Sequence, residues 1–349
     1  MFRPPPLPRT LDAALRDITS AKAAVRAEAA RDLVAHASDE GARDRVVGAL
    51  EGALRDKDGS VRAAAAVSLA DSEAREALPA LLVAVEDEDP MVRQMAITAL
   101  GEIGDPRATE RLRRALSDER PEVRFQAVIA FPRVIARREG ARDALLDATR
   151  DPDPLVCHIA LRMIEELATK LDEQGEEHGV VEEALARARE LLKHADGAVR
   201  VAAAILLGRA GEEVGRDLLV EVAKGDLATS EGDDEAAAIE LCGELGLTAA
   251  RPGLERRAFG GVLGIGRDRF AWHARVALAR MGHERATREI LRELDSWDRD
   301  RRTLAVAAVG RARLAAARGL VEAMRGDESR ADAGAVAEAL AALARPEAR

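Results

Sequence analysis

One unit of sequence recurs along this chain at nearly constant spacing. The segments "DKDGSVRAAAAVSLA", "DEDPMVRQMAITALG" and "DERPEVRFQAVIAFP" begin at Asp56, Asp87 and Asp118 and share an Asp, a Val-Arg pair and an Ala-rich tail. The Val of the pair falls at positions 61, 92 and 123, so the period is 31 residues. Repeats of this length are single supersecondary units that bury their apolar faces only against each other. The period therefore predicts one elongated array.

Each unit predicts a helical hairpin. Asp89 followed by Pro90 gives a helix N-cap and a proline at the first helical position, and apolar residues then recur at helical spacing. A glycine such as Gly101 or Gly104 ends this helix, and "DPRATERLRRALSD" begins the next one. Counting the weaker copies, the sequence predicts an all-α solenoid of about nine stacked hairpins. A single domain is expected over 10–349, with longer units near 165–198 and 251–269.

Composition agrees with closely packed helices. Hydrophobic residues make up 47% of the chain, but aromatic residues make up only 2% and there is no Tyr. A core of Ala, Leu, Val and Ile suits helices in close contact and disfavours a β-sandwich.

The quoted units resemble HEAT repeats, in the short form shared with phycobilin lyases. The resemblance implies a right-handed solenoid in which the turn Asp and the helix Arg form a hydrogen-bonded ladder between repeats. On this basis a structural role is expected for Asp56, Asp87, Asp118, Arg62, Arg93, Arg124 and Arg200. Cys157, Glu235 and Ala271 occupy the Arg position in other copies, where the ladder is expected to weaken.

The motifs favour no catalytic chemistry. Gly261 and Gly266 have the spacing of a phosphate-binding loop, but Arg267-Asp268 follows where Lys-Ser/Thr is needed. We expect an enlarged glycine-rich turn instead. Only one His-Glu pair is present, at His283, so the di-iron centre of deoxyhypusine hydroxylase, a HEAT-repeat enzyme, cannot be built here. The sequence predicts no enzyme, no cofactor and no metal site.

Charge and hydropathy disfavour two classes of protein, general nucleic-acid binders and membrane-spanning proteins. The net charge of −10 weighs against a general nucleic-acid binder. No run approaches the length of about 18 apolar residues that a membrane-spanning helix needs. Residues 1–9 form a proline-rich leader that is expected either to be disordered or to lie over the first unit. These features predict a cytoplasmic protein.

The remaining candidate site is a surface. The second helix of each hairpin, which opens with Val-Arg, lines the concave side of HEAT arrays, and positions two and six after the Val should point away from the packed face. Residues there are largely small or apolar, which is typical of a protein-binding groove. The candidates are Phe125, Ile129, His158, Arg162, Val201, Ile205, Trp272 and Val276, with Trp272 as the expected hot spot.

The favoured function is therefore a non-catalytic scaffold that holds a protein or peptide partner. It is also open that neighbouring helices cover these positions. A nucleic-acid-binding or DNA-repair protein, using the Arg cluster at 251–302, is one alternative. A chromophore lyase or chaperone, by resemblance to the phycobilin lyases, is the other.

Overall fold

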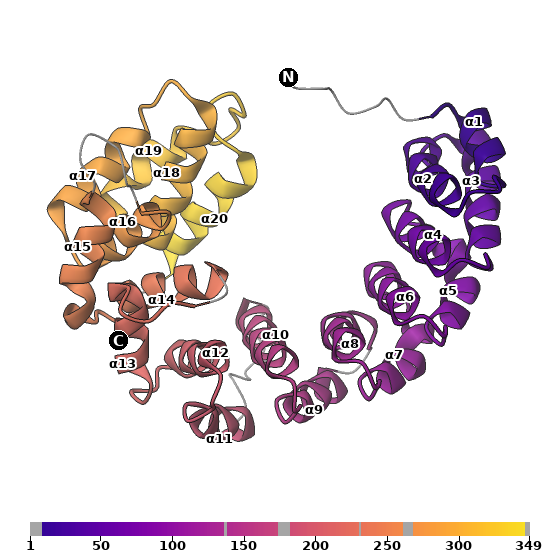
Figure 1. Ribbon diagram of the computed structural model, residues 1–349. Helices are drawn as coiled ribbons and strands as arrows, with labels where there is room; N and C mark the ends of the chain where they lie inside the picture. Colours follow the sequence, from indigo (N-terminus) through magenta and orange to yellow (C-terminus); the bar gives the residue numbers. More distant parts are fainter. Residues whose placement is uncertain (1–8, 136–137, 174–181, 230–231, 261–267, 346–349) are drawn as a thin grey trace. The chain divides into compact units, whose positions relative to one another are not determined.

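The computed structural model describes residues 9–135, 138–173, 182–229, 232–260 and 268–345. Across these ranges all regular structure is helical, with twenty α-helices and a few short 3-10 turns (Figure 1). The contacts divide the chain into two compact units, 1–167 and 168–349, where the sequence predicted a single domain over 10–349. That the two units form one uninterrupted stack stays a prediction.

The first unit contains five hairpins. Its helices are α1 (Leu11–Asp17), α2 (Ala23–Leu33), α3 (Glu40–Ala53), α4 (Gly59–Asp71), α5 (Leu78–Ala84), α6 (Pro90–Ile103), α7 (Thr109–Ala115), α8 (Pro121–Val134), α9 (Arg138–Ala148) and α10 (Pro154–Glu173). The second helices of the hairpins, α2, α4, α6 and α8, pack side by side in one layer. The first helices form the other layer (Figure 1).

The second unit repeats this arrangement. Its helices are α11 (Glu182–Leu191), α12 (Gly197–Arg209), α13 (Arg216–Lys224), α14 (Gly232–Glu244), α15 (Arg251–Phe259), α16 (Ala271–Arg280), α17 (Glu284–Glu293), α18 (Arg299–Arg311), α19 (Arg318–Glu322) and α20 (Ala333–Ala344). Second helices α12, α14, α16, α18 and α20 again pack in sequence. The described helices thus pair into ten hairpins where about nine were expected, because the closing helix α20 pairs with α19.

Local signals in the sequence set the helix boundaries. The Asp89 carboxylate accepts a hydrogen bond from the backbone N–H of Met91 at 2.9 Å, and Pro90 occupies the first helical position of α6. At the other end Gly104 adopts φ +67°, a left-handed conformation that glycine accepts without a steric cost. The Asp-Pro and Gly punctuation of the repeat therefore defines both ends of its second helix.

The predicted ladder is present in the first unit. Four arginines on second helices each donate two hydrogen bonds to the turn Asp of the next repeat, with N–O distances of 2.6–2.9 Å. The pairs are Arg26–Asp56, Arg62–Asp87, Arg93–Asp118 and Arg124–Asp151. The same guanidinium groups also donate to carbonyls of their own turns. Each ladder arginine therefore joins two consecutive turns.

The ladder changes after α8. At the Arg position of α10, the Cys157 thiol donates to the carbonyl of Thr149 at 3.1 Å. Arg200 keeps the contacts with its own turn, at the carbonyls of His194 and Ala195. In α14 the charge is reversed: Glu235 takes the Arg position and accepts from Arg257 on α15 at 2.7 Å. At Cys157 and Glu235, other contacts therefore take the place of the Arg–Asp pair.

The ladder predicts an acid-labile first unit. Hydrogen bonds from Arg26 hold the pKa of Asp56 below its ordinary 3.8, against the opposing effect of burial. A lowered pKa in the folded state contributes stability above the unfolded-state pKa, and this stability is lost as the pH falls. The free energy of unfolding should therefore fall below about pH 4. Chemical denaturation across that range should show a shallower decline for Arg26→Leu than for wild type, and an unchanged slope would contradict the prediction.

Some predicted features are only partly visible. Residues 1–8 of the leader lie outside the described residues, but Arg9 is anchored by ion pairs with Asp17, Glu28 and Asp32 on α1 and α2. The glycine-rich turn expected at 259–268 falls mostly outside the described residues, including Gly261 and Gly266. Among the described helices, none is long and apolar enough to cross a bilayer.

Candidate protein-binding face

The second helices expose a side that differs from the predicted one, which carries positions two and six after the Val. The two sides are about 50° apart around the helix axis, because a helix turns about 100° per residue. In the first unit the residue before the Val position and the residue ten after it are exposed in every repeat. These residues are Ala24, Ser60, Met91, Glu122 and Leu155, and Ala35, Asp71, Glu102, Arg133 and Glu166. Positions two and six after the Val lie at the margin of this side.

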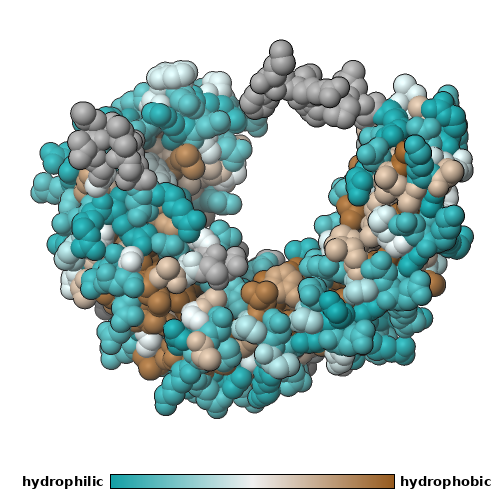
Figure 2. Space-filling model, viewed as in Figure 1, coloured by the Kyte–Doolittle hydropathy of each residue, from teal (hydrophilic) through white to brown (hydrophobic). Residues whose placement is uncertain are grey.

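Large apolar side chains lie on this side of α6 and α8, which pack against each other, and on the same side of α10. We call this set the apolar face. It comprises Met91, Met95, Phe125, Ile129, Leu155 and Ile159. Met91 and Leu155 are the most exposed, at 53% and 56% of their accessible surface. Figure 2 shows hydrophobic surface at α6 and α10. Soluble proteins seldom leave neighbouring large apolar side chains in water, and such a face is typical of a binding site.

Two of the predicted groove residues of the first unit belong to this face, and two do not. Phe125 and Ile129 are partly exposed on α8. His158, a predicted groove residue, is only 7% exposed on α10. Arg162 forms an ion pair with Glu165 one turn further along the same helix. His158 is therefore buried, and Arg162 is already engaged.

In the second unit three predicted groove residues are part of the core, and the expectation that they are exposed is wrong. Val201, Ile205 and Val276 are at most 2% exposed and belong to one hydrophobic cluster. Helix α12 packs against α11, α13 and α14, so its apolar residues are covered on several sides. The sequence left this outcome open.

Trp272, the expected hot spot, is partly buried and packs against the same cluster. Its indole N–H is buried and has no hydrogen-bond partner among the described residues. The ring therefore contributes mainly to the packing of α16.

Ion pairs link the second helices α12, α14, α16 and α18 of the second unit. Arg209 on α12 contacts Glu244 on α14 at 2.6 Å. Glu240, also on α14, contacts His273 on α16 at 2.6 Å and Arg311 on α18 at 2.7 Å. These groups satisfy one another, although Leu304 on α18 is still 53% exposed, so exposed apolar side chains occur in both units.

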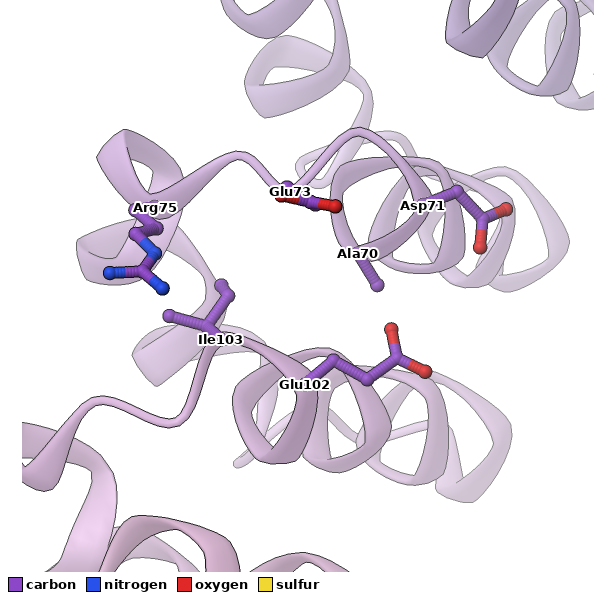
Figure 3. A pocket seen from close by; sticks show the side chains of 6 residues that line it. All are labelled: Ala70, Asp71, Glu73, Arg75, Glu102 and Ile103. Carbon is purple, nitrogen blue, oxygen red and sulfur yellow. The ribbon is translucent and has the colours of Figure 1, made fainter. Parts of the chain in front are cut away.

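A pocket of about 320 Å³ lies at the C-terminal ends of α4 and α6. Ala70 and Asp71 of α4 and Glu102 and Ile103 of α6 line it, with Glu73 and Arg75 from the connection after α4. Asp71 and Glu102 point towards the same side of the pocket, whereas Arg75 lies at the other end, beside Ile103 (Figure 3). Asp71, Glu73 and Glu102 have no cationic partner among the described residues. Sequence reasoning missed these acids because it considered only positions two and six.

Neither the Cys242 thiol nor a metal-ligating cluster provides a reactive centre within the described ranges. Burial raises the pKa of the Cys242 thiol to about 12, which keeps it protonated and unreactive. No cluster of His, Cys, Asp and Glu within the described ranges has the geometry of a metal site.

Comparison with known proteins agrees with the repeat geometry. Residues 46–132, which span α4, α6 and most of α8, match the family model described as HEAT repeats. This part of the chain carries HEAT repeats. No curated protein sequence matches it.

Solved structures share the fold. The YibA protein of Escherichia coli is 19% identical over 78% of this chain and 93% of its own length, with a TM-score of 0.53. Two likenesses are weaker and carry no functional argument. Importin beta is 14% identical over 95% of this chain and 51% of its own, with a TM-score of 0.49. The CpcE–CpcF complex of phycocyanin lyase from Nostoc is 20% identical over 82% and 96%, with a TM-score of 0.36.

Proposed function

We propose that this HEAT-repeat protein is a non-catalytic scaffold that binds a protein segment on the apolar face of its first unit. The observation that carries the proposal is the exposure of Met91 and Leu155 at the first turns of α6 and α10. Phe125, Ile129 and the remaining members extend this surface across α8. Burying such side chains contributes about 25 cal/mol per Å² of apolar surface.

The ladder supports this role by keeping the face in register. Arg93 and Arg124 link consecutive turns directly before the helices that present the apolar residues. A face held rigid before binding loses less conformational entropy when a partner docks. The first unit thus combines an apolar surface with a stiff scaffold beneath it.

Selection from a random peptide library displayed on phage, with the full chain as bait, tests the proposal. The best peptide should bind Met91→Gln/Leu155→Gln at least about tenfold more weakly than wild type. Both sites are exposed, so the double variant should keep its fold, as circular dichroism can verify. Fluorescence anisotropy measures the affinities.

Val83 provides a matched control. It is 71% exposed on α5, which belongs to the layer of first helices. Val83→Gln makes the same kind of polarity change away from the apolar face and should leave the affinity unchanged. Equal losses at both places, an unaffected double variant or a selection without enriched peptides would each refute the proposed function.

A further inference from the structure

We propose that the segment bound on the apolar face is basic, and that one of its arginines enters the pocket between α4 and α6. This inference rests on the proposed function and adds the chemistry of the partner. It follows from the position, the charge and the size of the pocket.

The pocket continues the exposed side on which the apolar face lies. Glu102 follows Met95 by seven residues, so both side chains project from the same side of α6. At about 1.5 Å of rise per residue, the two positions lie roughly 10 Å apart along the helix. If an extended partner places an apolar side chain on Met95, the partner residue about three positions further along its chain therefore reaches the pocket.

Acidic side chains lie at two edges of the apolar face, together with the exposed Arg120 and Arg133 of the α8 segment. Asp71, Glu73 and Glu102 contribute three carboxylates to the pocket against the single guanidinium of Arg75. At the other edge Glu88 and Glu119 have side chains that are 90% and 83% exposed, and these lie 3.6 Å from Arg62 and 3.9 Å from Arg93. A cationic partner would be attracted above all to the pocket, where the carboxylates outnumber the guanidinium.

The shape of the pocket favours arginine over a metal ion. Its carboxylates form no cluster that could hold a metal among the described residues. A guanidinium is planar and carries five N–H donors, so it can reach acceptors too far apart to share one ion. The volume of about 320 Å³ leaves room for such a group with its aliphatic stem against Ala70 and Ile103.

The peptides selected on the full chain provide the first test. They should be enriched in arginine about three positions from a large apolar residue if they bind extended, or about seven positions if they bind as a helix. Their dissociation constants should rise with salt. Asp71→Asn/Glu102→Gln should weaken an arginine-containing peptide by about tenfold or more, and replacing the peptide's arginine with glutamine should have the same effect.

Asp44 offers a control for the charge change. It is exposed on α3 in the layer of first helices, and Asp44→Asn should leave the affinity unchanged. Charge exchange gives the sharper result: Glu102→Lys should reject the arginine peptide and bind the version that carries glutamate at that position.

The outcomes separate the two proposals. Peptides that lose affinity with Met91→Gln/Leu155→Gln, yet lack basic residues or ignore Asp71→Asn/Glu102→Gln, would overturn the basic-partner inference and leave the apolar face standing. Basic peptides that respond to the pocket variant but not to the apolar variant would overturn the proposed function. Losses with both variants support both.

Discussion

Replacing Gly101 with valine should lower the free energy of unfolding of the first unit by about 3 kcal/mol. A Cβ atom at position 101 would lie 2.7 Å from the Cβ of Ala130 and 3.0 Å from its Cα. Gly101 belongs to α6 and Ala130 to α8, so the clash falls at the contact between two stacked second helices. The backbone of α8 must shift to accommodate valine, and every ladder contact at that junction shifts with it.

Urea denaturation followed by circular dichroism measures this effect. Gly48 in α3 is the matched control, since an added Cβ there meets nothing within 4 Å. Gly48→Ala should stabilise the protein by about 0.5–1 kcal/mol, because alanine loses less backbone entropy in a helix. Comparable behaviour of Gly101→Val and Gly48→Ala would mean that the helices are not packed as closely as described.

Removing the arginine from one Arg–Asp pair of the ladder should lower the free energy of unfolding by a similar amount. Arg93→Ala is expected to cost about 3 kcal/mol, because it leaves the Asp118 carboxylate without its cationic partner in a half-buried turn. The two side chains are 11% and 15% exposed, and Arg93 also donates to the carbonyl of Asp87. The substitution therefore removes contacts to two turns at once.

A double-mutant cycle isolates the rung. The combination of Arg93→Ala with Asp118→Ala should cost less than the sum of the single changes, because neither leaves a charge unpaired once both are gone. Arg114→Ala is the control: this side chain is 71% exposed, with a carboxylate 3.5 Å away, and its loss should change stability by less than about 1 kcal/mol. Strictly additive losses at 93 and 118 would show that the rung is not a coupled pair.

The fold and the ladder of the first unit were predictable from the sequence because their signals are local and periodic. Asp-Pro pairs, Val-Arg pairs and terminal glycines recur at the same spacing, and the structure places them at turns, rungs and helix ends. The ion pair between Glu235 and Arg257, in which the charges are reversed, was harder to predict from the sequence, because Arg257 lies outside the repeat pattern. Only tertiary packing brings these two side chains together.

The candidate site was harder to predict because it depends on a helix rotation of about 50°. Residues two and six after the Val lie at the border between core and surface, so a small difference in packing decides their exposure. Ile129 is partly exposed, whereas Ile205, which occupies the same repeat position in α12, is fully buried. Met91 and Leu155 follow the same repeat pattern, one position before the Val, and a full helical projection of the repeat identifies them.

Hydrogen–deuterium exchange of the full chain with a selected peptide tests the central claim most directly. Binding on the apolar face should slow amide exchange in α6, α8 and α10 and leave α5, α7 and α9 unchanged. Protection confined to the first helices, or to the second unit, would contradict the assignment of the binding surface to the apolar face.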